Sequence, residues 1–243
     1  MPEFDLVAHR GYPLRYPENT LPGIEAAIKA GARYVEVDVQ LTRDKIAVLY
    51  HDRDMLRLSN QPGAIHDYDM AQLALFHVTE SGRFGDEFNS MPIARLSELA
   101  DVIADNPAVI FFIELKRNSL EHFGDQQVLN VVTTTLQQVA SQCVFISYSL
   151  SVLSLLRAQT PHAIGVVIDD WKEHAQQAIA ELHPEYLFFD IESLPAQPVV
   201  FATSKLAVFE CTDPQQALAA ADRGVGLVET FAIAEMRQQL GFD

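Results

Sequence analysis

Short runs of apolar residues recur along this chain, and each run is followed by a stretch with helical spacing of apolar positions. Several runs are apolar on both faces, as in VIFFI, which is typical of parallel strands covered by helices. Strands are therefore predicted at 5–9, 34–41, 108–115, 143–147, 163–168, 186–190, 206–210 and 225–229.

The stretches between these runs are predicted to be helical. Thr20 is placed to cap the first helix and Gly31 to end it, while Asp213-Pro214 is a typical helix start. Eight strand–helix units in 243 residues favour a closed (β/α)8 barrel, a TIM barrel, over the alternative of an open doubly wound sheet. The predicted helices are 21–30, 94–105, 125–141, 150–160, 172–182, 193–203, 214–222 and 231–240.

One break in the alternation predicts a hairpin. Only TRDK separates the strand at 34–41 from the next apolar run, which is too short for a crossover between parallel strands. We predict that 46–50 folds back antiparallel around an Arg43-Asp44 turn, so that partner numbers sum to 87. In that register His51 lies opposite Glu36 and points to the same face.

A second break covers 53–92, where the chain has Pro62-Gly63, Gly82 and Gly85 but no strand–helix unit. We interpret this segment as an inserted subdomain over one end of the barrel. The remaining pattern is continuous, and we therefore predict a single domain over 1–243 with the insert inside it.

The bulk properties exclude several classes of protein. A formal net charge of −16 argues against nucleic acid or an anionic membrane as the main partner. Two cysteines within apolar runs, Cys143 and Cys211, are interpreted as buried thiols. We find no apolar run of membrane-spanning length and no signal peptide before the first strand, so we expect a cytoplasmic protein without stable membrane association. The oligomeric state cannot be predicted from the sequence.

Three carboxylates lie at the ends of predicted strands. Glu36 and Asp38 share one strand face by alternation, and Glu114 shares a face with Lys116. In a barrel such side chains converge at the C-terminal mouth, where barrel enzymes place their chemistry. The alternative is a solvated strand face or a structural ion pair with Lys116. Oxygen-only ligands favour Mg²⁺ or Ca²⁺ over zinc, with Mn²⁺ as a further candidate.

Two histidines complete this set. His9 and His51 both end strands that flank the Glu36–Asp38 pair, whereas the other histidines lie in polar or helical surroundings. Imidazoles suit proton transfer, and the cationic Arg10 and Lys116 suit a phosphate. The inventory is the one that metal-assisted cleavage of a phosphodiester requires.

The motifs that carry these residues resemble the signature of the glycerophosphodiester phosphodiesterase family. Order and spacing match over 5–116. The matching stretches are His9-Arg10-Gly11, Pro17-Glu18-Asn19-Thr20, Glu36-Val37-Asp38-Val39, His51-Asp52 and Glu114-Leu115-Lys116.

The resemblance implies a TIM barrel with a subdomain inserted after the His51 hairpin. It implies metal ligation by Glu36, Asp38 and Glu114, and acid/base roles for His9 and His51. Phosphate contacts would come from Arg10 and Lys116, while Glu18 and Asn19 would shape the first loop. Arg57 and Tyr148 also lie where the family has similar residues.

The C-terminal half departs from the family pattern. Phe209-Glu210-Cys211-Thr212 stands where a tryptophan-threonine-x-asparagine stretch is usual, and Glu229-Thr230-Phe231 replaces a threonine-aspartate ending. The usual glycine of the hairpin turn is Lys45. Phe209 can still pack against a glycerol backbone, and Glu210 is expected at the mouth, where burial of an unpaired charge is avoided.

The sequence thus predicts metal-dependent hydrolysis of small-molecule glycerophosphodiesters to glycerol 3-phosphate and an alcohol. Attack by the glycerol 2-hydroxyl would give a cyclic phosphate that water opens, and direct attack by water is the other route. The alternatives are a related phospholipase D-type enzyme or lyase that stops at the cyclic phosphate, and a family member that binds phosphorylated ligands without turnover.

Overall fold

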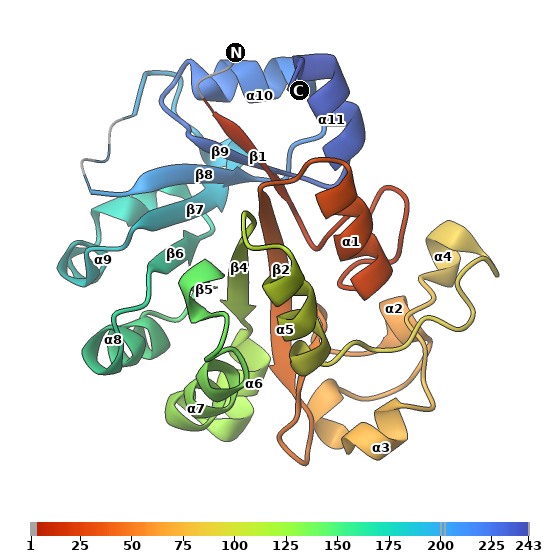
Figure 1. Ribbon diagram of the computed structural model, residues 1–243. Helices are drawn as coiled ribbons and strands as arrows, with labels where there is room; N and C mark the ends of the chain where they lie inside the picture. Colours follow the sequence, from red (N-terminus) through yellow and green to blue (C-terminus); the bar gives the residue numbers. More distant parts are fainter. Residues whose placement is uncertain (1–3, 200, 202, 243) are drawn as a thin grey trace.

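Eight parallel strands close into a barrel in the computed structural model, which describes residues 4–199, 201 and 203–242 (Figure 1). The strands are β1 (Asp5–Ala8), β2 (Tyr34–Leu41), β3 (Ala47–Leu49), β4 (Ile110–Leu115), β5 (Cys143–Ser147), β6 (Ile164–Ile168), β7 (Tyr186–Asp190), β8 (Lys205–Phe209) and β9 (Leu227–Thr230). They follow the order β1-β9-β8-β7-β6-β5-β4-β2-β3, and a pairing of β1 with β2 closes the ring. Only β3 is antiparallel to its neighbour among the described pairings. The predicted TIM barrel is confirmed.

Strand alternation fills the barrel interior in two levels. The lower level is an apolar cluster that includes Val7, Phe112, Ala207 and Leu227. Because strand side chains alternate between faces, the residues two positions further along point to the same side. These are His9, Glu114, Phe209 and Glu229, which all line a cavity at the C-terminal ends of the strands. The apolar floor therefore lies beneath a layer of side chains that is polar except for Phe209 among those named.

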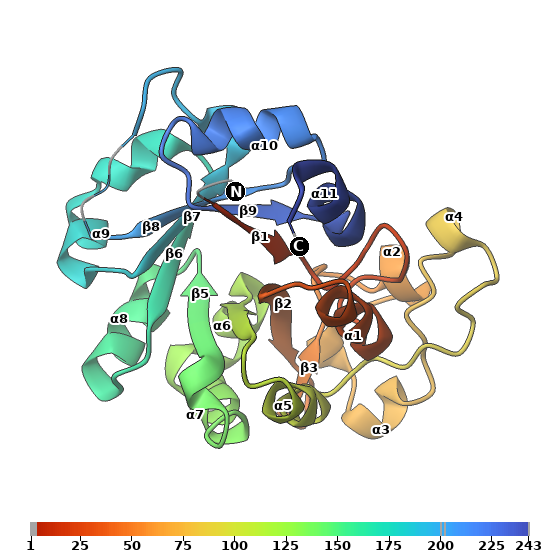
Figure 2. The same cartoon turned by 45° about the horizontal axis from the view of Figure 1, so that its top comes forward.

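Helices surround the strands on the outside, as Figure 2 shows. The odd-numbered residues of β2 (Val35, Val37, Val39 and Leu41) belong to the cluster between sheet and helices, on the opposite face from Glu36 and Asp38. The helices are α1 (Leu21–Lys29), α2 (Leu56–Ser59), α3 (Met70–Leu73), α4 (Ser81–Phe84), α5 (Leu96–Asp105), α6 (Arg117–Phe123), α7 (Asp125–Thr135), α8 (Leu150–Gln159), α9 (Gln177–Leu182), α10 (Pro214–Ala221) and α11 (Ile233–Leu240).

Three helix predictions need correction. The helix expected at 125–141 ends at Thr135, and the one at 172–182 is a 3₁₀ segment (Trp171–Ala175) followed by α9. No helix spans the described part of 193–203, although a short 3₁₀ turn covers Ile191–Ser193; residues 200 and 202 lie outside the described residues. Pro195 and Pro198 both fall in that stretch, and proline removes a backbone donor from a helix interior.

The hairpin of β2 and β3 forms, but the predicted register is wrong by one residue. Val39 pairs with Leu49 and Leu41 with Ala47, so partner numbers sum to 88. The loop has three residues rather than two because Lys45 adopts a left-handed backbone conformation, with φ of 63°. His51 is therefore not opposite Glu36 in the ladder, and it follows the end of β3.

Replacing Lys45 with glycine is expected to stabilise the fold. A residue with a Cβ atom loses roughly 1 kcal/mol in the left-handed region, and the greater backbone freedom of unfolded glycine offsets part of that gain. We expect the free energy of unfolding to rise by about 0.5 kcal/mol in urea titration. The control is Lys45→Ala, which also removes the exposed hydrogen bond to Gln127 but keeps the strain. Equal stability of the two variants would contradict the explanation.

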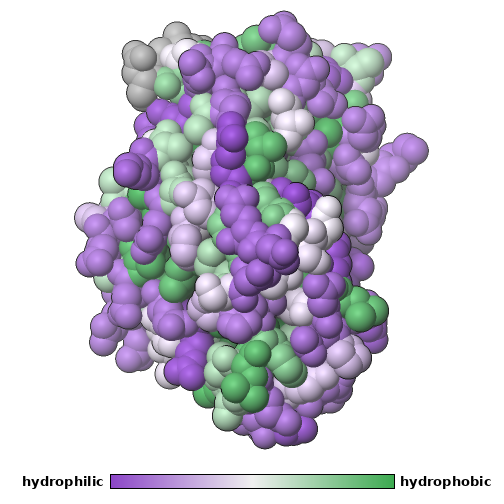
Figure 3. Space-filling view, turned by 90° about the vertical axis from the view of Figure 1, so that its right-hand side faces the viewer, coloured by the Kyte–Doolittle hydropathy of each residue, from purple (hydrophilic) through white to green (hydrophobic). Residues whose placement is uncertain are grey.

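The segment 53–92 consists of short helices around a small core that is separate from the core of the barrel. This core joins the hairpin residues Val48 and Tyr50 to insert residues that include Leu58, Ile65 and Leu73. Figure 3 views the side on which α2, α3 and α4 lie in Figure 1, and this face is mostly hydrophilic with smaller hydrophobic patches. Because its core includes residues of the hairpin, the insert packs against the hairpin beside the barrel.

Two further sequence predictions can be compared with the structure. Cys143 and Cys211 are buried free thiols, as predicted, and burial raises the pKa of Cys143 to about 12. Among the described residues, no helix has both the length and the apolar character needed to cross a membrane.

Candidate active site

A cavity of about 260 Å³ opens at the C-terminal ends of the strands. It brings together seven of the eight site residues predicted from the sequence, and the eighth, Asp38, lies beside Glu36 and Glu114. No residue of 53–92 lines it, so the insert predicted over one end of the barrel contributes nothing to the wall of this cavity. The lining residues are His9, Arg10, Glu36, His51, Glu114, Lys116, Ile146, Tyr148, Val167, Phe188, Phe209, Glu210 and Glu229.

Three buried carboxylates form the centre of the site. One oxygen from each of Glu36, Asp38 and Glu114 lies within 4.8 Å of the others. Adjacent pairing of β2 with β4, in which Asp38 is level with Glu114, creates this arrangement. Burial and the neighbouring Asp38 and Glu229 carboxylates hold the pKa of Glu36 well above its usual value. Its Oε1 atom is buried and accepts no hydrogen bond from the described residues.

This donor set fits a hard divalent cation. The three ligands are oxygen donors, their charge is concentrated in a small buried volume, and the orphaned Glu36 oxygen is a ready ligand. The three residues can therefore hold a metal ion.

Two cationic side chains face the carboxylates. The Nζ atom of Lys116 lies 3.1 Å from Oδ1 of Asp38 and 2.9 Å from Oε1 of Glu114, and the Nε atom of Arg10 lies 3.3 Å from Oδ2 of Asp38. Burial alone would raise the pKa of Asp38, but Lys116 and Arg10 lower it below its usual range. Asp38 is therefore held as a carboxylate, whereas the surroundings of Glu36 shift its pKa in the opposite direction.

The first loop fixes Arg10 above the carboxylates. Arg10 has a positive φ of 55°, and its backbone N–H donates to Glu36 Oε2 at 3.0 Å. Asn19 donates from Nδ2 to Asp38 Oδ2 at 2.8 Å and accepts from the Asp38 N–H at 3.0 Å. The contacts of Arg10 with Glu36 and of Asn19 with Asp38 join the loop after β1 to β2. A backbone conformation that side chains rarely adopt is maintained only where surrounding contacts enforce it.

His9 is buried among carboxylates. Its Nε2 atom lies 3.7 Å from Glu36 and 3.8 Å from Glu229, its Nδ1 atom lies 3.9 Å from Glu210, and its ring stacks on Phe231 at 4.8 Å. Burial, with Arg10 adding to the effect, lowers the pKa of His9 well below its usual value. Stacking holds the ring in place, so that the imidazole stays inside the cavity.

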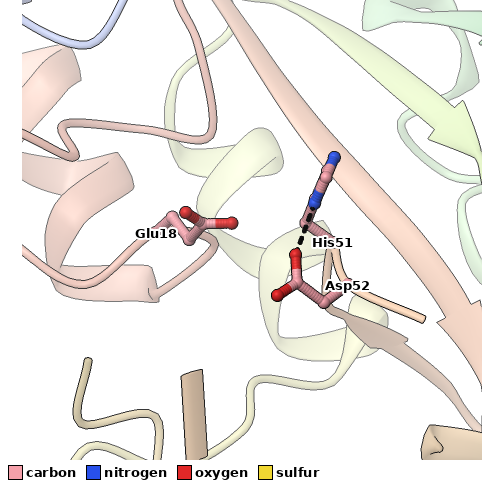
Figure 4. Close-up of side chains that lie close together, drawn as sticks. All are labelled: Glu18, His51 and Asp52. Carbon is pink, nitrogen blue, oxygen red and sulfur yellow. Dashed lines mark hydrogen bonds and ion pairs between the residues drawn. The ribbon is translucent and has the colours of Figure 1, made fainter. Parts of the chain in front are cut away.

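His51 reaches the cavity from the loop after β3. Its Nδ1 atom lies 2.8 Å from Oδ1 of Asp52 (Figure 4). The buried amide of Gln40 donates from Nε2 to the carbonyls of Tyr50, His51 and Asp52 at 2.9, 3.1 and 2.7 Å. These hydrogen bonds fix the backbone of the loop beyond the end of the β2–β3 ladder. They explain why His51 lines the cavity although the predicted hairpin register was wrong by one residue.

The sequence analysis missed the buried position of Glu229. Only 3% of this residue is exposed, and its Oε1 atom has no hydrogen-bond partner among the described residues. The signal was a carboxylate at the end of an apolar strand, but it was interpreted only as a departure from the family pattern. Glu210 lies at the mouth as predicted, with 46% of its side chain exposed, beside Arg10 at 3.6 Å.

Comparisons with known proteins agree with this geometry. Residues 9–227 match the model of the glycerophosphoryl diester phosphodiesterase family. Glycerophosphodiester phosphodiesterases of Bacillus altitudinis and Caldanaerobacter subterraneus are 29% and 27% identical, over 65% and 74% of this chain and 63% and 75% of theirs.

A solved structure shows the same fold. An Oleispira antarctica phosphodiesterase, determined in complex with the product sn-glycerol-3-phosphate, has a TM-score of 0.85 at 24% identity, covering 98% of this chain and 96% of its own. The family match spans nearly the whole barrel, including each of the motifs that meet in the cavity. This chain therefore belongs to the glycerophosphoryl diester phosphodiesterase family.

Proposed function

We propose that this protein hydrolyses glycerophosphodiesters to glycerol 3-phosphate and an alcohol, with a divalent cation held by Glu36, Asp38 and Glu114. The observation that carries the proposal is the meeting of three carboxylates, two imidazoles and two cationic side chains at one cavity. The product bound to the Oleispira relative supports the choice of substrate. Mg²⁺ and Ca²⁺ are the cations that oxygen ligands favour, and Mn²⁺ is a further candidate.

When held by Glu36, Asp38 and Glu114, a divalent cation would supply positive charge that polarises a phosphoryl oxygen and makes a nearby hydroxyl more acidic. Arg10 and Lys116, which line the cavity beside the carboxylates, bind the remaining phosphoryl oxygens and offset the charge that develops on them. Phe209 lines the same cavity, and its ring would pack against the glycerol carbons. These contacts orient the phosphorus for attack.

The two histidines transfer the protons. One imidazole removes a proton from the attacking hydroxyl, and the other delivers a proton to the alkoxide that leaves. His9 stands at the end of β1 and His51 after β3, so the two rings approach the cavity from different strands. Both the attack by the glycerol 2-hydroxyl and the direct attack by water need this pair.

The test uses purified protein with Mg²⁺ or Ca²⁺ and glycerophosphocholine or glycerophosphoethanolamine, and follows the products by ³¹P NMR. Release of glycerol 3-phosphate supports the proposal. Accumulation of a cyclic phosphate as the end product would instead identify a lyase. Saturable binding of glycerol 3-phosphate without turnover would identify a binding protein.

We propose further that residues 53–92 form an inserted subdomain of one domain that covers 1–243. Its core is shared with the hairpin that carries His51, and α2 lies directly after that loop.

The net charge of −16 supports a small-molecule substrate over nucleic acid. We keep the cytoplasm as the proposed location.

Glu210 is expected to favour cationic alcohol groups. Its half-exposed carboxylate at the mouth attracts choline or ethanolamine, and a charge pair near solvent contributes about 1 kcal/mol or less, roughly a fivefold preference at most. Glu210→Gln should lower kcat/KM for glycerophosphocholine relative to glycerophosphoglycerol by up to that factor. The control is Glu87→Gln, an exposed residue outside the cavity lining. An unchanged ratio in Glu210→Gln would show that this carboxylate does not select the alcohol.

A further inference from the structure

Arg57 of α2 binds two carboxylates at once, although it does not line the cavity. It donates to Asp52 from Nε and Nη2, both at 2.7 Å, and to Glu18 from Nη1 and Nη2 at 2.8 and 2.9 Å. Each carboxylate is therefore held through both of its oxygens. A planar guanidinium matches this double fork, and a lysine ammonium does not.

Each of the two carboxylates contacts a residue of the proposed site. Asp52 Oδ1 lies 2.8 Å from Nδ1 of His51, and Glu18 Oε1 accepts from Nη1 of Arg10 at 3.1 Å. Figure 4 shows Glu18 and Asp52 close together, and the second ring nitrogen of His51 points away from Asp52. Arg57 is thus linked through Asp52 to His51, the proposed acid/base group, and through Glu18 to Arg10, the proposed phosphate-binding group.

The contact to Asp52 decides which nitrogen of His51 is available. A carboxylate that accepts from Nδ1–H keeps the proton on that atom, which leaves Nε2 as the site of proton transfer. Gln40 holds the backbone of this loop but makes no contact with the side chain of Asp52 among the described hydrogen bonds. The direction of the Asp52 carboxylate therefore depends on Arg57.

The surrounding charges agree with this dependence. Glu80, which is buried, lies 3.3 Å from Arg57 and accepts from the Glu18 backbone N–H at 2.9 Å. Burial alone would raise the pKa of Asp52, but His51 and Arg57 lower it below its usual range. Removing Arg57 takes one positive charge away from three neighbouring carboxylates. Glu18 keeps Arg10 at 3.1 Å and Glu80 keeps Arg83 at 3.0 Å, whereas Asp52 keeps only His51 among the described ion pairs.

We propose that Arg57 is a positioning residue that orients His51 through Asp52 and Arg10 through Glu18. The inference rests on the proposed acid/base role of His51. It gives the inserted segment a function other than contact with substrate, because a side chain of the insert holds two side chains of the barrel in their working directions. Residues behind the reacting groups that orient them typically contribute about 10- to 100-fold to activity.

The kinetic test compares Arg57→Ala, Arg57→Lys and Arg53→Ala in the full chain. Arg57→Ala should lower kcat by about 10- to 100-fold with a much smaller change in KM, and added guanidinium ion should restore part of kcat. Arg57→Lys should fall between the wild type and Arg57→Ala, because one ammonium cannot form both forks. The control Arg53→Ala removes an exposed arginine of the same segment, whose ion pair among the described residues joins it to exposed Glu121 at 3.5 Å, and it should keep the wild-type rate.

A second measurement does not depend on turnover. ¹⁵N NMR of histidine-labelled protein should show the Nδ1–H form of His51 in the wild type and a mixture of both tautomers in Arg57→Ala. Unchanged kcat, or a loss of kcat with an unchanged tautomer and no guanidinium rescue, would overturn the proposal.

If Arg57→Ala does not fold, Asp52→Asn should show the same loss of kcat and the same altered tautomer of His51. Wild-type behaviour of Asp52→Asn would overturn the proposal equally. A wild type without phosphodiesterase activity would refute the proposed function. The tautomers of His51 in the wild type and in Arg57→Ala would still decide the role of Arg57.

Discussion

His9→Ala and His51→Ala are each expected to slow turnover by about 10²–10⁴-fold, which is the usual contribution of a positioned acid or base. Both imidazoles line the cavity, and His51 has a carboxylate on its Nδ1 atom that keeps Nε2 available. Steady-state rates with glycerophosphocholine at saturating metal measure the loss. Because both residues serve one proton-transfer scheme, the double variant should lose much less than the product of the two single effects.

Two controls separate chemistry from folding. Metal affinity, measured by isothermal titration calorimetry, should survive both substitutions because the imidazoles are not ligands in the proposed site. His77→Ala removes a histidine that lies outside the cavity lining, and it should turn over at the wild-type rate. A near wild-type rate in His9→Ala or His51→Ala would remove that residue from the acid/base scheme.

Chelation is expected to abolish activity. Without a cation, three carboxylates within 4.8 Å of one another repel each other and also repel the phosphate of the substrate. Activity should disappear in excess EDTA and return when Mg²⁺, Ca²⁺ or Mn²⁺ is added. Full turnover after verified removal of metal would contradict the proposed metal site.

Variants of the carboxylates locate the cation. Glu36→Gln and Glu114→Gln should weaken metal binding as well as turnover, because each removes a charged ligand. Glu229→Gln is the matched control, since Glu229 is an equally buried carboxylate of the same cavity but does not belong to the group of three. It should keep near wild-type metal affinity by calorimetry. Equal losses in all three variants would show a general effect of charge and not ligation.

The strand positions and the shared face of Glu36 and Asp38 could be predicted from the sequence, because alternation along a buried strand has a fixed period. The hairpin register could not be predicted, because it depends on the left-handed backbone of Lys45, which has the Cβ atom that usually disfavours that conformation. His51 reached its predicted place by another route, through the hydrogen bonds of Gln40 to the loop backbone.

Contacts between side chains from distant segments were the hardest to predict. Glu18 and Arg57 are 39 residues apart, and their contact depends on how the insert docks. The burial of Glu229 depends on the pairing of β9 with β1, strands from opposite ends of the chain, which no local pattern encodes. Local periodicity therefore identified the carboxylates of the proposed metal site, whereas the residues proposed to position the histidines needed the tertiary structure.

The pairing of β1 with β9 has a consequence for biosynthesis. Asp5 to Ala8 pair with Leu227 to Thr230, and the His9 N–H donates to the Thr230 carbonyl at 3.1 Å. A ribosome that has released residues 5–116 has delivered every predicted ligand and both histidines, yet the strand that carries His9 still lacks one of its two neighbours. Vectorial synthesis thus leaves β1 of the nascent chain without this neighbour, and the cavity unclosed on that side, until β9 has emerged.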